Sequence, residues 1–111
     1  MVIKIIKKAM FKVVNENKGT AFKSRLKDVK FAGKTGTSQV RSISLAERES
    51  DEFRKKEQEW KNRDHALFVG YIPYDDPEYA ISVIIEHGGS GASTAAPIAK
   101  QVFNYIHKLN L

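Results

Sequence analysis

Two apolar runs, residues 66–72 and 79–85, constrain the fold of this 111-residue chain more than any other feature. They are separated by only six residues, Pro-Tyr-Asp-Asp-Pro-Glu. Apolar runs of this length are typical of strands, and so short a connection favours an antiparallel hairpin, which we place at residues 65–86. Both faces of each run are largely apolar, so we expect helices or further chain to cover the hairpin on both sides.

A helix is predicted near the N-terminus. Ile3, Ile6, Met10 and Val13 recur at spacings of three and four, which is the period of an amphipathic helix. We place this helix at residues 2–17. We expect Gly19 to follow its end in the left-handed conformation that often terminates helices.

A second helix is predicted at residues 94–108. Ser93 or Thr94 can cap its N-terminus, and Pro97 lies in the first turn, where proline is tolerated. Its predicted apolar face consists of Ile98, Val102, Tyr105 and Ile106.

Residues 29–40 are predicted to form a third strand. Val29 and Phe31 alternate with Lys30, and the small and hydroxyl residues that follow allow another backbone to approach closely. Residues 44–63 are dense in alternating charge, with Leu45, Phe53 and Trp60 as their only large apolar residues, and we interpret them as a charged excursion. The predicted fold class is therefore α+β, an antiparallel sheet of about three strands flanked by an N-terminal and a C-terminal helix.

Charge is distributed unevenly along the chain. Residues 1–34 carry ten basic and two acidic side chains, whereas residues 64–111 carry two and five. The basic part has one arginine and few aromatic residues, so we do not expect it to bind nucleic acid and interpret it as a solvated helix face. The absence of cysteine excludes disulfides and thiolate metal sites.

The triplet Lys34-Thr35-Gly36 is the most informative candidate site. A phosphate-binding P-loop is excluded, because Asp28 stands where a glycine is required and the following segment reads as a strand. A solvent-facing lysine in a polar turn is the structural alternative. The third interpretation is the Lys-Thr-Gly strand of enzymes that acylate a serine, where a cation and hydroxyl donors suit a substrate carboxylate and glycine lets the strand come close.

The sequence around the triplet favours the third interpretation. In order, the chain carries residues 32–39 (Ala-Gly-Lys-Thr-Gly-Thr-Ser-Gln), 64–73 (Asp-His-Ala-Leu-Phe-Val-Gly-Tyr-Ile-Pro), 77–78 (Pro-Glu), 84–88 (Ile-Ile-Glu-His-Gly) and 95–99 (Ala-Ala-Pro-Ile-Ala). With a helix ending in Asn15-Glu16 and the turn Gly19-Thr20-Ala21, the chain resembles the C-terminal third of the transpeptidase domain of class B penicillin-binding proteins, most closely the elongation type. The resemblance covers nearly all of residues 1–111 and implies a part of a penicillin-binding-protein/β-lactamase-like transpeptidase fold.

The resemblance also implies roles for individual residues. Lys34 would support the electrostatics around the nucleophile, and the Thr35 and Thr37 hydroxyls would hold a substrate or drug carboxylate. The backbone N–H of Thr37 would supply half of an oxyanion hole. Lys34 and Thr37 are thus the candidate catalytic residues. The candidate substrate-binding residues are Thr35, Gly36, Thr37 and Ser38.

The nucleophilic serine of the family is expected outside these 111 residues. In the family it belongs to a Ser-x-x-Lys motif far upstream, and a Ser-x-Asn motif lies between it and the Lys-Thr-Gly strand. The chain contains no Ser-x-Asn. Its one Ser-x-x-Lys, Ser24 to Lys27, begins only ten residues before Lys34, and we interpret it as coincidence. We therefore expect the chain to be a C-terminal fragment that is inactive by itself.

The resemblance implies that the full-length protein is a serine-type peptidoglycan D,D-transpeptidase that cross-links cell-wall stem peptides and binds β-lactams without a cofactor. It also implies anchoring in the inner membrane on the periplasmic face. We expect self-association of the fragment through exposed apolar surface. The alternative function is a non-catalytic basic binding module that has kept the same sheet.

Two weaker candidates remain. His65, Glu86 and His87 could approach one another on neighbouring strands and bind zinc. A structural role is favoured, because spacing on two strands leaves the ligands unpaired and no third histidine is nearby. The run 88–91, Gly-Gly-Ser-Gly, could cradle an anion before a helix, but it fits a flexible turn equally well.

Overall fold

The computed structural model describes residues 1–40 and 62–110. Its elements in chain order are α1 (Val2–Asn15), the 3₁₀ helix η1 (Phe22–Ser24), β1 (Ala32–Ser38), β2 (His65–Ile72), β3 (Tyr79–Ile85), the π-helix η3 (Gly91–Ala95) and α4 (Ala96–Lys108). The predicted charged excursion at 44–63, with Leu45, Phe53 and Trp60, lies outside the described residues except for its last two positions.

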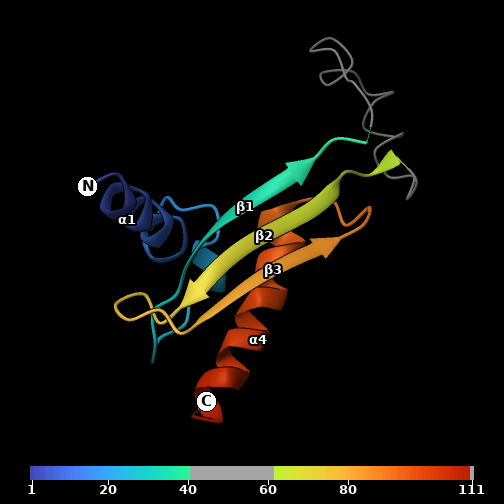
Figure 1. The fold of residues 1–111 in the computed structure, drawn as a ribbon. Helices are drawn as coiled ribbons and strands as arrows, with labels where there is room; N and C mark the ends of the chain where they lie inside the picture. The colour runs from blue at the N-terminus through green and yellow to red at the C-terminus, as the bar shows by residue number, and fades with distance from the viewer. Residues whose placement is uncertain (41–61, 111) are drawn as a thin grey trace.

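The strands form one antiparallel sheet in the order β1-β2-β3 (Figure 1). The central strand β2 pairs with both neighbours, so that Leu67 lies opposite Gly36 on one side and Ile84 on the other. The predicted architecture of three antiparallel strands with a helix at each end is therefore confirmed. Strand β1, which carries the Lys-Thr-Gly triplet, is an edge strand of the described sheet.

The first strand is shorter than predicted, because its pairing begins at Ala32 rather than at Val29. Ala32 pairs with Tyr71, the residue before the last one of β2. Pro73 follows β2 and has no backbone N–H with which to extend the ladder. Phe31 therefore lies just outside the strand, with its side chain fully buried.

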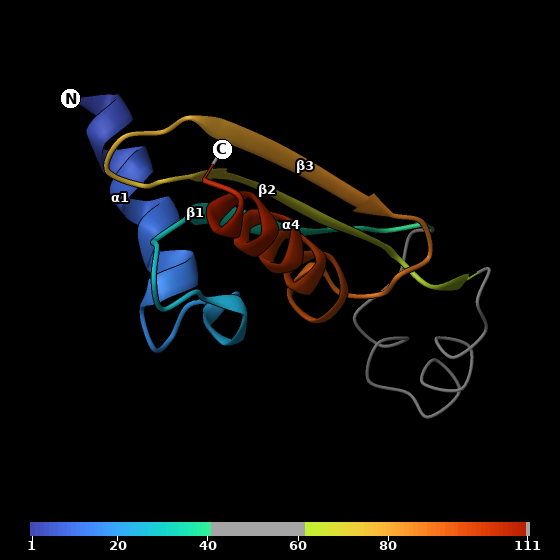
Figure 2. The ribbon, with the colours of Figure 1, turned by 90° about the horizontal axis from the view of Figure 1, so that it is seen from below.

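The core lies between α4 and one face of the sheet. Figures 1 and 2 show α4 packed across the sheet and α1 beside β1. The ring of Phe31 lies 6.3 Å from that of Phe68 on β2 and 5.0 Å from that of Phe103 on α4, measured between centroids. Val14 of α1 is fully buried in the same cluster, so both helices share one core.

Most of the predicted apolar face of α4 is wrong. Of its four residues only Ile106 packs against the core, and Ile98 is 36% exposed. The buried residues are Ala96, Ala99 and Phe103, whereas Val102 and Tyr105 are 41% and 64% exposed. Alanines let the helix backbone approach the sheet closely, and a single phenylalanine then fills the remaining space. Close packing thus selected small residues over the larger aliphatic ones that the hydrophobic pattern favoured.

The second face of the sheet has no helix over it in residues 1–40 and 62–110 (Figure 2). On that face Val69 is 47% and Ile84 64% exposed. The expected cover on both faces is therefore missing from the described part of the chain, because α1 lies beside the sheet instead of over it. The first turns of α1 are also exposed, with Ile3 at 73% and Ile5 at 65%.

Helix α1 ends at Asn15, two residues before the predicted end, and Gly19 is not in the left-handed conformation. The reason for a glycine is steric instead. A Cβ at this position would overlap the carbonyl oxygens of Val13 and Lys12. The chain folds back so tightly that the N–H of Ala21 donates to the carbonyl of Val13 at 3.0 Å.

A membrane span needs a helix of roughly 20 apolar residues. None of the helices within residues 1–40 and 62–110 is long and apolar enough to cross a bilayer.

Candidate active site

The predicted site residues all lie on β1 but point to two sides of the sheet. Side chains alternate along a strand, so Thr35 and Thr37 lie on the face that α4 covers, while Lys34, Gly36 and Ser38 lie on the other. All five residues are exposed or half-buried, and all lie on the edge strand of the described sheet.

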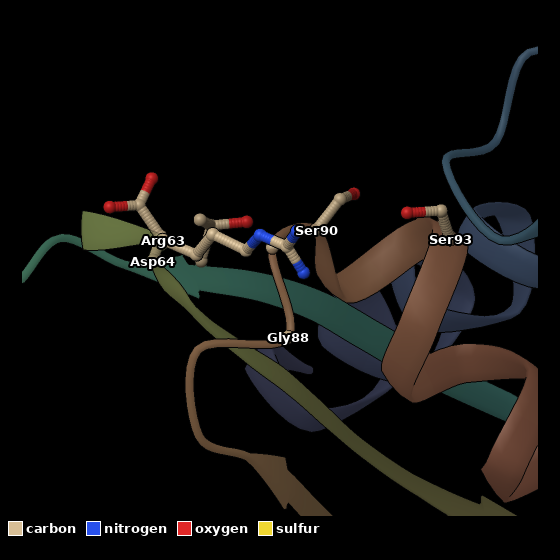
Figure 3. Close-up of a pocket in the computed structure, with 7 residues that line it drawn as sticks. Arg63, Asp64, Gly88, Ser90 and Ser93 are labelled. Carbon is tan, nitrogen blue, oxygen red and sulfur yellow. The ribbon is translucent and has the colours of Figure 1, made fainter. Parts of the chain in front are cut away.

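Thr37 lines a hollow of about 400 Å³, here called the Thr37 hollow. Figure 3 shows side chains that reach it from two places, Arg63 and Asp64 just before β2 and Ser90 and Ser93 around the start of η3. The wall thus combines three hydroxyl groups with one cationic and one anionic side chain. The hydroxyl groups and the guanidinium of Arg63 are donors that can hold a ligand carboxylate, whereas Asp64 can only accept.

Residues 88–91, here called the glycine-rich turn, lie beside the Thr37 hollow and are connected to the sheet by hydrogen bonds. The N–H of Gly89 donates to the carbonyl of Asp64 at 2.9 Å, and the hydroxyl of Thr94 donates to the carbonyl of Gly88 at 2.7 Å. A Cβ on Gly91 would overlap the backbone of Gly36, so this glycine lets η3 lie directly against β1 and β2. The turn is therefore a fixed wall of the hollow.

The predicted cap of the C-terminal helix is wrong. The helical segment begins earlier, at Gly91, and the side chain of Ser90 accepts the N–H of Ala92 at 3.2 Å. Thr94 uses its hydroxyl on the turn instead, and Ala95 at the start of α4 has no side-chain cap. The π-helix adds a turn before Pro97, so the cap moves toward the N-terminus.

Lys34 lines a second hollow, of about 320 Å³, between α1, the turn after it and β1; we call it the Lys34 hollow. Its charged residues are Lys12, Lys18 and Lys34 with one acid, Glu16. The ammonium of Lys34 donates to the carbonyl of Thr35 at 2.7 Å. The excess of lysines favours an anionic ligand over a cationic one.

Thr20 lies at the border of the Lys34 hollow and reaches the Lys-Thr-Gly strand. Its Oγ1 is 2.8 Å from the Oγ1 of Thr35, close enough for a hydrogen bond between the two hydroxyl groups. Sequence reasoning placed Thr20 in a turn and gave it no role. The only available signal was that turn itself, Gly19-Thr20-Ala21, because nothing local connects it to a residue 15 positions away.

Gly36 is not required by the packing within the described chain. A Cβ on it would lie 3.5 Å from the Cβ of Leu67, which is an ordinary contact. If Gly36 is needed for a close approach, as the sequence predicted, the group that approaches it is therefore a ligand and not the neighbouring strand.

His65 and His87 lie next to each other, and their contacts to the backbone are typical of a structural role. The backbone N–H of His87 donates to Nδ1 of His65 at 2.9 Å, and the two rings are 4.8 Å apart. Nδ1 of His87 lies 3.1 Å from the carbonyl oxygen of Arg63. In residues 1–40 and 62–110 no three His, Asp or Glu residues are grouped to hold a metal ion.

Ser24, the serine of the Ser-x-x-Lys match, lies in η1 and is 4% exposed. A nucleophile for a peptide must be accessible to the carbonyl that it attacks. The position of Ser24 therefore supports its interpretation as coincidence.

Comparisons with known proteins identify the family of this chain. Residues 1–104 match the family described as the penicillin binding protein transpeptidase domain. The chain is 41% identical over 100 residues to the peptidoglycan D,D-transpeptidase MrdA of Haemophilus influenzae, and 42% identical over 100 residues to that of Acinetobacter baumannii. These matches cover 89% and 90% of this chain but only 15% and 14% of the relatives, so the chain spans about one seventh of their length.

Solved structures show the same relationship. The penicillin-binding protein PBP2 of Helicobacter pylori, in its complex with MreC, aligns with a TM-score of 0.77 and 30% identity, over 96% of this chain and 17% of that one. PBP2 of Pseudomonas aeruginosa aligns with a TM-score of 0.67 and 36% identity, over 91% and 18%. Together with the Lys-Thr-Gly edge strand, these findings place the chain in the family of penicillin-binding-protein transpeptidase domains.

Proposed function

We propose that the protein to which this chain belongs is a peptidoglycan D,D-transpeptidase, and that residues 34–38 form one wall of its active site. The position of Lys34-Thr35-Gly36 on an edge strand carries the proposal: Lys34 is exposed, Thr35 and Gly36 are half-buried, and the strand lies between two hollows lined with hydroxyl and lysine side chains. The MrdA relatives, which bear that activity in their names, support it.

The proposed reaction exchanges one amide bond for another. A serine hydroxyl, supplied by a part of the protein outside these residues, attacks the carbonyl of the penultimate D-alanine of a stem peptide. The terminal D-alanine leaves as an amine with the serine proton. An amine of a neighbouring stem peptide then attacks the ester, forms the cross-link and restores the serine.

Lys34 and Thr37 have different tasks in this proposal. The ammonium of Lys34 provides positive charge beside the nucleophile. The backbone N–H of Thr37 donates to the oxyanion that forms on the attacked carbonyl. The hydroxyls of Thr35 and Thr37 hold the terminal carboxylate, and the two residues beside Thr37 complete the contact, Gly36 by leaving space for the peptide and Ser38 by its hydroxyl.

A β-lactam would enter the same site, since it presents a carboxylate and a reactive amide in a similar arrangement. Acylation by a β-lactam therefore tests the proposal. In the full-length protein, Lys34→Ala should lower the acylation rate about 10²- to 10³-fold, the usual effect of removing one electrostatic group from such a site. Lys30→Ala, which removes an exposed lysine just before β1, is the matched control.

Thermal unfolding of both variants should match that of the unchanged protein. Near-normal acylation of Lys34→Ala would remove Lys34 from the site. The 111-residue chain alone should form no adduct with a large excess of penicillin, as measured by intact mass. A stable adduct mapped to Ser24 would show that the chain contains its own nucleophile.

We also propose that the full-length protein acts on the periplasmic face of the inner membrane, where its peptidoglycan substrate lies. Fractionation of cells with an antibody against this chain tests the location. Recovery of the full-length protein in the soluble cytoplasmic fraction would contradict it.

A further inference from the structure

The two hydroxyl groups of Thr20 and Thr35 meet across the border between the turn after α1 and the edge strand. Thr20 is exposed, and its contact with Thr35 is open to solvent. The two Oγ1 atoms lie 2.8 Å apart. A hydroxyl has one hydrogen to donate and two lone pairs to accept. The pair therefore uses one of its two hydrogens internally and keeps the other for a ligand.

Thr20 is held firmly in place for this contact. The preceding Gly19 packs against the last turn of α1, and its N–H donates to the carbonyl of Glu16 at 2.8 Å. The following Ala21 is 1% exposed and donates its N–H to Val13. Thr20 is thus an exposed side chain between two anchored neighbours, which fixes the position of its hydroxyl relative to β1.

The surroundings favour an anion as the ligand of the remaining hydrogen. Thr20 shares the Lys34 hollow with Lys12, Lys18 and Lys34, against one acid, Glu16. A hydroxyl that donates to its neighbour also polarises that neighbour, so the second hydroxyl becomes a better donor to a carboxylate. If Thr35 is the internal donor instead, the hydrogen of Thr20 is the one that faces the ligand.

We propose that Thr20 is a positioning residue for the substrate carboxylate, which it serves by directing the hydroxyl of Thr35 or by completing a two-hydroxyl clamp with it. This inference rests on the proposed function, because it assigns Thr20 to the carboxylate subsite of that same site. It extends the site from the Lys-Thr-Gly strand to the turn that follows α1.

The test compares two forms of one ligand. The full-length protein is acylated by a penicillin and, separately, by the methyl ester of the same penicillin, whose carboxylate charge is gone. Thr20→Val keeps the shape of the side chain and removes the hydroxyl. Thr20→Ser keeps the hydroxyl and is the conservative control.

For the acid, Thr20→Val should lower the second-order acylation constant about tenfold, as expected for one hydrogen bond to a charged group. The loss should lie mainly in the dissociation constant of the noncovalent complex, and Thr20→Ser should restore most of it. For the ester, the unchanged protein and Thr20→Val should react at nearly equal rates. The difference between the two ligands isolates the interaction with the carboxylate.

Three results would overturn the inference. Equal acylation of the unchanged protein and Thr20→Val by the acid would show that Thr20 does not act on the site. An equal loss with acid and ester would show that Thr20 only supports the fold. If Thr20→Val fails to fold, Thr20→Ala and Thr20→Ser are compared in the same way, and equal rates with the acid would overturn it. Absence of acylation in the unchanged protein would instead contradict the proposed function, on which the inference rests.

Discussion

Nδ1 of His65, at the start of β2, accepts the backbone N–H of His87 across 2.9 Å and so ties the glycine-rich turn to the sheet. His87 has a positive φ of 54°, a conformation that costs free energy for any residue other than glycine. The hydrogen bond helps to hold that conformation. Because the same turn lines the Thr37 hollow, the contact links the stability of β2 and β3 to the shape of the candidate site.

The first prediction concerns this contact. His65→Ala should lower the free energy of unfolding by about 1 kcal/mol, the net value of one hydrogen bond. His65→Asn, whose side-chain oxygen can accept the same N–H, should retain most of the stability. Urea unfolding measures both. Equal stability of the Ala and Asn variants would show that the hydrogen bond contributes nothing.

The second prediction concerns the buried face of α4. Phe103→Ala should cost about 3–5 kcal/mol, because the ring is fully buried against Phe31 and its loss leaves a cavity. Tyr105→Ala on the same helix, where the side chain is 64% exposed, should change stability by less than about 0.5 kcal/mol. A larger effect at Tyr105 than at Phe103 would mean that α4 packs through the face that the sequence pattern suggested.

The third prediction concerns Tyr71, whose buried hydroxyl has no hydrogen-bond partner among the described residues. Tyr71→Phe should leave stability at pH 7 unchanged or raise it by up to about 1 kcal/mol, because an unsatisfied buried group is removed. Tyr105→Phe, at an exposed position, is the control. A clear loss of stability in Tyr71→Phe would indicate a partner for the hydroxyl.

The alkaline behaviour of Tyr71 gives a second measurement of the same variant. Burial raises the pKa of the Tyr71 phenol above its ordinary value of 10.0, and the nearby Tyr74 raises that pKa further. The unfolded chain therefore loses this proton first, so stability falls as pH rises above about 10. Tyr71→Phe should show a shallower alkaline decline than the unchanged protein, measured by urea unfolding at several pH values.

The fourth prediction contrasts Gly91 with Gly36, two glycines whose backbones lie close together. Gly91→Ala should destabilise the protein by about 1–3 kcal/mol, since its Cβ would overlap backbone atoms of Gly36 and Leu67, which cannot move aside cheaply. Gly36→Ala should leave thermal unfolding nearly unchanged, because its Cβ makes only an ordinary contact. Similar melting temperatures for the two variants would contradict the close packing of η3 on the sheet.

The fifth prediction concerns the apolar surface of the 111-residue chain. Ile3 and Ile5 on α1 and Ile84 on β3 are each more than 60% exposed, so the isolated chain should self-associate. Sedimentation over a wide concentration range measures this. The variant Ile3→Lys with Ile5→Glu should associate less. A monomer at all concentrations would contradict the prediction.

The sequence alone determined the architecture and the identity of the candidate strand. Continuous apolar runs, alternation and a period of 3.6 residues are local properties, so the hairpin, the third strand and the two helices could be located from the order of apolar side chains. The Lys-Thr-Gly triplet and the motifs around it are also local strings, and they were sufficient to indicate the family.

Only the tertiary structure decided which surfaces meet. The buried face of α4 depends on how closely a helix can approach the sheet, which a hydrophobic pattern does not contain. Ala96, Ala99 and Phe103 are therefore the buried residues of α4, and of the predicted face only Ile106 packs against the core. The same holds for Gly19, whose role is set by the carbonyl oxygens it touches and not by its conformation. The contact between Thr20 and Thr35 joins a turn to a strand 15 positions later in the chain. Only tertiary packing brings two residues so far apart in sequence within hydrogen-bond distance.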